Sequence, residues 1–518
     1  MIKDGYLKVR RYVTKGVKKT YVEASFLLMV LTTIMYRCMI IRDYVSKIID
    51  EDQALMWYGT VMASRFEIKE PHFLGQAYGS MIESIVAAPF YMIGIPLQYA
   101  MPVATFILWY SPFVLIYIFL RNKNAIWAIL VLVVPMINNW NYDLLTSIPR
   151  SFIPGFVIAT IGIILMVDIN QNRYFRFLMS FLFMAIGYVH TETTITVSAL
   201  AVLYVLLYDF NNVVENFKIL VMGVVFSVLI IYFCNYYFYD INPEFLLHGG
   251  ATQLNLSFDV LKLNLEKNII DTLNTFSFVK IGDISLTFVL WISSLICLLI
   301  RHELKFVIIN ICACIGTVLF FSLGKTMDFA DELLFSQARM FLFVPYIFAE
   351  ILLFSGLVFN EMKVSFMLLR AITAFITLIF IIISTWKCLY FENVVLAKEC
   401  LYKSEVINTC KVNSIYKTSN EISQMVKEYD CDVVVILSDS RLIGYASGAI
   451  NNDQYLSYNA FYDRRTNTYI NLKDNNIVRN VLLVSFIGND ISSFETVCIH
   501  GDIIEWLKRN RGLERRPL

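Results

Sequence analysis

The sequence predicts an α-helical polytopic membrane protein with about 11 transmembrane helices and a small α/β domain at its C-terminal end. Of its 518 residues, 58% are hydrophobic and only 16% are charged, whereas a soluble domain carries about 25% charged residues. Apolar runs of about 17–22 residues recur between residues 21 and 385, and such a run crosses the ~30 Å hydrocarbon core as a helix. Because a lipid-exposed backbone must satisfy its own hydrogen bonds, these runs are expected to be helices rather than open sheet.

The N-terminal residues 1–21 are basic and are expected to stay in the cytoplasm by the positive-inside rule. They lead directly into the first span, 22–41, so the pair resembles a signal anchor rather than a cleavable signal peptide. The next residues, 42–101, then form outer loop one. The net charge of +1 provides no basic field of the kind that attracts nucleic acid. The leader contains seven cations and one acid: Lys3, Lys8, Arg10, Arg11, Lys15, Lys18, Lys19 and Asp4.

The apolar stretch 82–98 is interrupted by Pro89, Gly94 and Pro96, and we expect it to lie along the outer interface rather than to cross. The second span, 102–120, then ends at the basic turn 121–123 on the inner side. This arrangement puts the C-terminal end outside, in a multi-pass protein of the plasma or inner membrane. The other expected spans are 124–139, 152–169, 175–190, 193–208, 217–238, 284–300, 305–322, 340–358 and 364–385.

Residues 386–518 are more polar and predict an extracytoplasmic α/β domain, separate from the transmembrane domain at 22–385. Residues 421–429 have the pattern of an amphipathic helix, and 433–437 and 480–487 that of buried strands. Residues 503–508 are expected to form a closing helix. Outside the cell Cys400 could pair with Cys410, although spacing alone does not decide a disulfide.

Charged groups gather in the loops expected outside, beginning with Asp50-Glu51-Asp52 just after the first span. Carboxylates and cations together at a membrane surface suit one kind of reaction. A base deprotonates an acceptor hydroxyl while cations hold a phosphate leaving group whose lipid tail stays in the bilayer. Arginine matches phosphate oxygens with a two-pronged fork, and lysine supplies a point charge.

The loop-one residues resemble the first outer loop of GT-C glycosyltransferases. The similarity lies in the acidic triplet, in the pattern Phe73-x-Gly75-Gln76-x-Tyr78-Gly79-Ser80-x-x-Glu83, and in Ala87-Ala88-Pro89-Phe90 with Gly94. The branch resembled is that of bacterial relatives of protein O-mannosyltransferases and of the aminoarabinose transferase of lipid A. Two later patterns are also similar: an arginine shortly before a proline, at 339–345, and the polar turn 187–192. The family typically has a lysine in that turn, and His190 departs from it.

The resemblance implies an enzyme that moves a sugar, with inversion, from a polyprenyl-phosphate donor to the hydroxyl of a glycan, lipid or protein acceptor. It implies a catalytic role in the acidic triplet, with Asp50 or Asp52 as the base or as ligand of a divalent ion such as Mg or Mn. The residues expected to act are catalytic Asp50, Glu51 and Asp52; donor-phosphate-binding Arg339, Lys325 and Arg150; and substrate-binding His72, Gln76, Tyr78, Glu83, His190 and Glu192.

Each assignment has a structural alternative. The acidic triplet could cap the following helix, and Glu83 could be an interfacial residue facing water. Arg339 could be a snorkelling anchor, and His72 and His190 could be structural hydrogen-bonders. Two other functions also stay open. A lipid or polysaccharide transporter would carry charges in mid-span and broken helices near the midplane, whereas here the charges concentrate at the outer ends. An inactive GT-C-like scaffold is the other.

Overall fold

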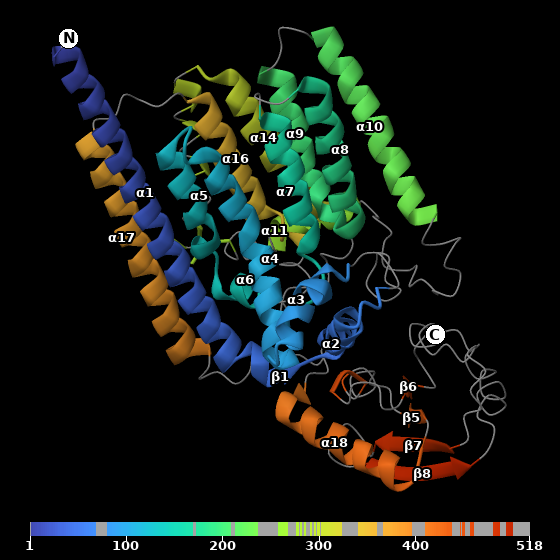
Figure 1. Cartoon of the computed structure of the whole chain (residues 1–518). Coiled ribbons are helices and arrows are strands. Elements are labelled where there is room, and N and C mark those ends of the chain that lie inside the picture. Colours follow the sequence, from blue (N-terminus) through green and yellow to red (C-terminus); the bar gives the residue numbers. More distant parts are fainter. Residues whose placement is uncertain are drawn as a thin grey trace.

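The computed structural model shows a bundle of helices with a small sheet at one end (Figure 1). The N-terminus lies at the opposite end of the bundle from that sheet. Helix α1 (Ile2–Asp43) runs beside α17 (Phe366–Tyr390) along one edge. The structure describes residues 2–68, 80–168, 172–208, 213–236, 257–267, 276–278, 280–281, 284–285, 291–292, 295–296, 298–300, 302–323, 340–359, 366–395, 410–431, 433–437, 446, 448–450, 456–459, 480–486 and 494–500.

Ten of the eleven expected spans coincide with helices. They are α1 (Ile2–Asp43), α4 (Leu97–Leu120), α5 (Ala125–Ile137), α7 (Pro154–Val167), α8 (Arg173–His190), α9 (Ile195–Tyr208), α10 (Val213–Tyr236), α14 (Leu304–Leu319), α16 (Val344–Val358) and α17 (Phe366–Tyr390).

Among the described residues, five helices are long and apolar enough to cross a membrane, and several shorter apolar helices accompany them. The chain is therefore a multi-pass membrane protein. The five are Thr20–Lys47, Leu97–Leu120, Phe217–Cys234, Leu304–Ser322 and Met367–Asn393.

The one remaining expected span, 284–300, was predicted to begin as a helix at 284, and this is wrong. Strand β3 (Ile284–Ser285) pairs antiparallel with β2 (Lys280–Ile281). The intervening sequence Gly282-Asp283 is typical of a two-residue hairpin turn, and the β-branched isoleucines beside it favour strands. A short helix that was not predicted, α11 (Phe258–Lys267), precedes this hairpin.

The two helices of outer loop one are α2 (Glu51–Ser64) and α3 (Ile82–Met92). The predicted interruption after α3 is confirmed: Gly94 has a φ of +92°, a conformation that glycine adopts readily. Pro96 then precedes the first turn of α4 as its N-cap residue. The stretch 82–98 is thus two elements, and its position along the membrane interface remains a prediction.

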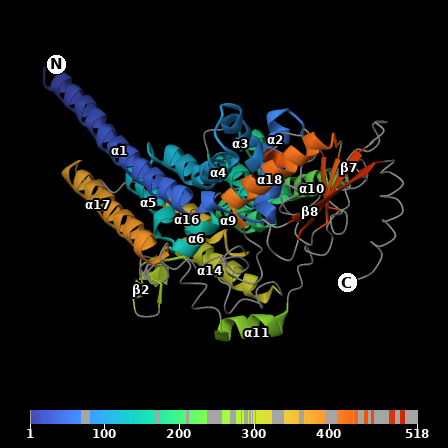
Figure 2. The same ribbon diagram turned by 90° about the horizontal axis from the view of Figure 1, so that it is seen from below.

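Ion pairs connect the helix ends that were expected to lie inside. Arg121 lies 3.8 Å from Glu23, and Lys123 lies 3.6 Å from Asp168. These pairs join α1, α4 and α7 at the end of the bundle nearer the N-terminus, and α2, α3 and the sheet lie at the other end (Figures 1 and 2). The predicted alternation of the first spans is consistent with this placement.

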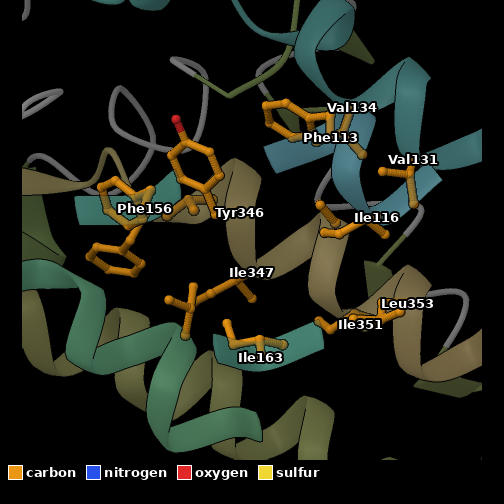
Figure 3. Close-up of a cluster of buried hydrophobic side chains, with 14 of the residues drawn as sticks. Phe113, Ile116, Val131, Val134, Phe156, Ile163, Tyr346, Ile347, Ile351 and Leu353 are labelled. Atoms are coloured by element: carbon orange, nitrogen blue, oxygen red, sulfur yellow. The ribbon is translucent and has the colours of Figure 1, made fainter. Parts of the chain in front are cut away.

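Helix α16 packs against α4, α5 and α9, and its Tyr346 also reaches Phe156 of α7 (Figure 3). The Tyr346 ring stacks on Phe156 with centroids 4.3 Å apart and on Phe113 at 5.4 Å. The labelled cluster also includes Val131 of α5 and Ile163 of α7, and both are buried. Close aromatic packing of this kind holds the helices in one arrangement.

The tail contains a four-stranded sheet in the order β6-β5-β7-β8, in which the first three strands are parallel and β8 is antiparallel to β7. The predicted strands at 433–437 and 480–487 are confirmed. The predicted helix at 421–429 is the second half of a longer one, and 503–508 lie outside the described residues. The elements are α18 (Val412–Glu428), β5 (Val433–Leu437), β6 (Leu456–Asn459), β7 (Asn480–Phe486) and β8 (Phe494–His500).

The tail shares a hydrophobic core with outer loop one. Strand β1 (Ile48–Ile49), directly before Asp50, pairs antiparallel with β4 (Cys410–Lys411). Ile415 of α18 is fully buried in the cluster that contains Leu55 and Trp57 of α2, and Figure 2 shows α18 lying beside the loop-one helices. The tail therefore packs against the segment that carries the acidic triplet.

Shortening Ile415 to alanine is expected to weaken this packing by about 2–5 kcal/mol, because the substitution leaves a cavity in a buried cluster. The tail should become more susceptible to limited proteolysis in detergent solution. The matched control is Lys417→Gln on the exposed face of the same helix, which should behave as wild type. Equal resistance of Ile415→Ala and wild type would contradict the shared core.

Candidate active site

Asp50 begins α2 as its N-cap. Its Oδ1 accepts a hydrogen bond from the Gln53 backbone N–H at 2.9 Å, and the Gln53 side chain accepts one from the Asp50 N–H at 3.3 Å. This reciprocal pair is a capping box. The alternative that the triplet caps the next helix is therefore confirmed for Asp50. The cap also fixes the direction of a buried carboxylate, whose residue is only 3% exposed.

Arg150 joins two of the three predicted acids. Its Nη2 pairs with Asp50 Oδ2, and its Nη1 lies 3.4 Å from Asp52 Oδ2. Burial raises the pKa of Asp50, and the Arg150 guanidinium opposes that shift. The Asp52 side chain is 34% exposed against 4% for Asp50, so the pair has a buried member and an accessible member. The structure describes Glu51 as the first residue of α2, half-buried.

A short turn carries Arg150 to this position. Helix α6 (Trp140–Leu145) is capped by Asn139, and the chain then turns so that Ser151 has a φ of +65°. The Ser151 hydroxyl contacts both the N–H and the carbonyl of Ser80, just before α3. Contacts at Ser80 and at Asp50 thus hold residues 150–151 on both sides.

Glu83 lies beneath this turn and is fully buried. Burial raises its pKa from 4.5 to about 7, while the backbone N–H groups of Ser151 and Arg150 and the Thr105 hydroxyl, 3.2 Å from Oε2, oppose the rise. The alternative that Glu83 faces water is therefore wrong. The carboxylate instead lies close to the backbone of the Arg150 turn, and the Thr105 hydroxyl is the hydrogen-bond partner of its Oε2.

Replacing Glu83 with glutamine should remove a pH dependence of stability. The folded protein holds the Glu83 proton more tightly than the unfolded chain, so stability falls as pH rises from 4.5 to about 7. The full loss amounts to about 3 kcal/mol. Thermal unfolding in detergent at pH 5 and pH 8 should show a smaller difference for Glu83→Gln than for wild type. A control variant at a half-exposed glutamate, Glu23→Gln, should keep the wild-type difference; a variant of Glu83 that keeps it too would refute the buried carboxylate.

The polar turn at 190–192 lies against the same segment. The Thr191 hydroxyl accepts a hydrogen bond from the Gly155 N–H at 3.2 Å and lies 3.4 Å from the Phe152 carbonyl oxygen. Gly155 and Gly187 let α7 and α8 approach so closely that a Cβ on Gly155 would lie 2.5 Å from the Gly187 carbonyl oxygen. His190 ends α8 and Glu192 begins the short helix η2 (Glu192–Thr194), and both are half-buried.

Five predicted site residues lie outside the described part of the chain: His72, Gln76, Tyr78, Lys325 and Arg339. The structure brings together Asp50, Asp52, Arg150 and Glu83, and it places the turn with His190 and Glu192 next to the segment that follows Arg150. Their roles in binding and catalysis remain proposals.

A second group of buried charges is centred on Asp143 of α6. The Asp143 carboxylate accepts hydrogen bonds from Arg37 of α1 at 2.9 Å and from the Tyr36 hydroxyl at 2.8 Å, and it pairs with Lys387 of α17. The three charged side chains are at most 1% exposed. Lys387 also donates to the Asn138 carbonyl at 2.8 Å, just past the end of α5.

This group is connected to the Arg150 turn through α6. Arg37 Nη1 donates to the Ser147 hydroxyl at 2.7 Å, three residues before Arg150. Its guanidinium also lies 4.0 Å from the Trp109 ring centroid. The predicted spans 124–139 and 152–169 leave Asp143 in the loop between them, and no role was predicted for Arg37 or Lys387. A cation inside or beside an apolar span is the signal that could have identified them.

The donor set does not fit the suggested divalent ion. Arg150 supplies the positive charge between Asp50 and Asp52 that a metal would supply. Among the described residues, no group of three or more His, Cys, Asp or Glu side chains is arranged to hold a metal.

One charge contradicts the expectation that charges stay at the outer ends. Glu350 lies in the middle of α16 and is 2% exposed. Neither of its carboxylate oxygens has a hydrogen-bond partner among the residues that the structure describes. An acid in mid-span is a feature expected of a transporter, so this observation keeps that alternative open.

Two solved structures match almost the whole chain. One is ArnT from Cupriavidus metallidurans bound to undecaprenyl phosphate, with a TM-score of 0.51 and 11% identity over 88% of this chain and 92% of that one. The chain has the ArnT fold. The apo structure of the same ArnT aligns with a TM-score of 0.49, 12% identity, and 89% and 92% coverage. No sequence-family profile matches the chain, and no curated protein matches it in sequence.

The ArnT-like fold confirms the GT-C resemblance suggested by the loop-one residues. At 11% identity the likeness concerns the fold and does not transfer the activity.

Proposed function

We propose that the protein is a membrane glycosyltransferase that moves a sugar from a polyprenyl-phosphate donor to an acceptor hydroxyl outside the cytoplasm. The observation that carries the proposal is the Asp50–Arg150–Asp52 group at the start of α2, in which Asp50 and Arg150 are buried and Asp52 is accessible. The ArnT-like fold supports it, since that ArnT is bound to undecaprenyl phosphate. The reaction requires a cation for the phosphate and a base for the hydroxyl, and an arginine and a carboxylate lie side by side here.

Arg150 is the described residue best suited to the donor phosphate. Its guanidinium already holds two carboxylates, and it would exchange one of them for phosphate oxygens with the same fork geometry. Asp52 is the accessible partner and the one that Arg150 releases most readily, at 3.4 Å. Lys325 and Arg339 are proposed to add positive charge to the same leaving group.

Asp50 is proposed as the base. Its carboxylate is oriented by the capping box, and burial raises its pKa, which favours its acceptance of a proton. The acceptor oxygen forms a bond to the anomeric carbon as the bond from that carbon to the phosphate oxygen breaks. The hydroxyl proton passes to Asp50, and polyprenyl phosphate leaves. Attack opposite the leaving group inverts the anomeric centre.

Glu83 is proposed as a positioning residue, although a substrate contact was expected. It is fully buried, and it reaches the backbone of Arg150 and Ser151. His72, Gln76, Tyr78, His190 and Glu192 are proposed to line the substrate path.

The test is recognition of the lipid phosphate by the purified protein. Undecaprenyl phosphate at about 100 times its dissociation constant should raise the stability of wild type by about 2.7 kcal/mol, and undecaprenol should not. Arg150→Lys keeps the charge but loses the fork, so its affinity for the lipid phosphate should fall at least about tenfold. A shift of the same size with undecaprenol, or none with either lipid, would overturn the proposal.

A further inference from the structure

Two cysteines of the tail come together although 67 positions separate them. The sulfur of Cys431 lies 3.6 Å from that of Cys498. Cys431 follows α18, and Cys498 lies in β8, opposite Leu482 of β7. Cys431 is buried and Cys498 is half-buried. The pair named as possible from the sequence, Cys400 with Cys410, is not tested, because Cys400 lies outside the described residues.

The backbone around Cys431 is held in place from two sides. Its N–H donates to the Val426 carbonyl oxygen at 2.9 Å, in the last turn of α18. The Asn480 side chain donates to the Asp430 carbonyl at 2.8 Å and so ties this turn to β7. Cys498 is held by the β7–β8 pairing. The two thiols therefore meet because the fold places them together.

We propose that Cys431 and Cys498 form a disulfide in the mature protein. A disulfide bond is about 2.05 Å long, so the sulfurs need to approach by about 1.5 Å, which small side-chain rotations provide. The bond joins the end of α18 to β8, one of the two edge strands of the sheet. Because α18 shares its core with α2, the bond would reinforce the platform on which Asp50 lies.

The oxidation is a thiol–disulfide exchange with an oxidised thiol oxidoreductase. The Cys498 thiol, the more accessible of the two, loses its proton and attacks the oxidoreductase disulfide. This forms a mixed disulfide and releases one oxidoreductase thiolate. The Cys431 thiolate then attacks the Cys498 sulfur, closes the intramolecular bond and expels the second thiolate. The oxidoreductase thus gains the two electrons and two protons that the cysteines lose.

The proposal also makes the tail a reporter of membrane sidedness. Structural disulfides form and persist in oxidising compartments and are rare in the cytoplasm. The basic N-terminal leader and the alternation of spans predict that the tail lies outside. An oxidised Cys431–Cys498 pair is the chemical state expected there.

The experiment counts thiols in the full-length protein. Cells are lysed in N-ethylmaleimide, and the purified protein is denatured in fresh N-ethylmaleimide, freed of reagent, divided, and treated with maleimide-polyethylene glycol with or without prior reduction. Reduction should add two more labels to each wild-type chain than to the Cys431→Ser/Cys498→Ser double variant. Peptide mass spectrometry should find the two cysteine peptides joined until reduction. Cys312 and Cys314 of α14 are internal controls, because N-ethylmaleimide should block them in every sample once denatured.

Two results would overturn the disulfide. One is full alkylation of both thiols in unreduced wild type, and the other is a joined peptide that links one of them to a different cysteine. Each single variant should show one new free thiol at the remaining partner. Variants that fail to accumulate do not obstruct the test, because the wild-type mass measurement decides it alone.

Discussion

Asp50→Asn is expected to lower sugar transfer by about 10²- to 10⁴-fold, the usual contribution of a general base. Asparagine serves as an N-cap about as well as aspartate does, so α2 keeps its cap while the group that accepts the proton is lost. Arg150 keeps Asp52 as a partner, so the loss of stability should be smaller than the cost of about 3–5 kcal/mol expected when a buried charge loses its partner entirely. Transfer is therefore compared per folded molecule. The rate of transfer is measured in membranes that contain equal amounts of each variant, with a donor whose polyprenyl-phosphate-linked sugar is labelled.

Controls for Asp50→Asn separate catalysis from charge. Asp43→Asn removes an acid at the end of α1 that pairs with the exposed Arg42, and it should transfer at the wild-type rate. Asp52→Asn should weaken transfer less than Asp50→Asn if Asp50 is the base. A larger loss at Asp52 would assign the base to the accessible carboxylate and leave Asp50 as a helix cap.

Asp143→Asn is expected to destabilise the folded protein by about 3–5 kcal/mol, the cost of leaving buried charges without their partner. Arg37 and Lys387 would then lie together with no carboxylate between them. The unfolding midpoint in detergent should fall clearly. Sugar transfer per folded molecule should fall as well, because Arg37 also orients Ser147 in the turn before Arg150.

The charge balance of this group gives a second measurement. Lys387→Met leaves the Arg37–Asp143 pair intact and neutral, so it should cost less stability than Asp143→Asn. Asp168→Asn, which breaks a partly exposed pair with Lys123, should cost no more than about 1 kcal/mol. If Lys387→Met proved the most destabilising of the three, the capping of carbonyls near the end of α5 would outweigh the charge balance.

Much of the fold could be predicted because its determinants are local. A run of apolar residues long enough to cross a bilayer specifies a helix wherever it occurs. Pro89, Gly94 and Pro96 break the chain by their own backbone geometry, and α3 is indeed separate from α4. The error at 284–300 has a local cause as well, because Ile281-Gly282-Asp283-Ile284 fits a hairpin better than the start of a span.

The candidate site could be predicted only as a set of residue types. Asp50, Arg150 and Glu83 were all named, but nothing in one sequence connects Asp50 with a partner 100 positions away. Glu83 could equally have faced water, because an acid at the start of a short helix is ordinarily exposed. Its burial comes from Thr105 of α4 and from the Arg150 turn packing over it.

The chain alone was enough to predict a helical membrane protein and to locate most of its helices, because these features depend on hydrophobic length and on backbone restriction. The packed structure was needed to show that Asp50 caps α2 and is bridged to Asp52 by Arg150. It was also needed to show that Arg37 and Lys387 converge on Asp143 and that the tail packs against loop one. The physical reason is that a buried charge takes its partner from whichever helix packs beside it, and packing depends on the whole bundle.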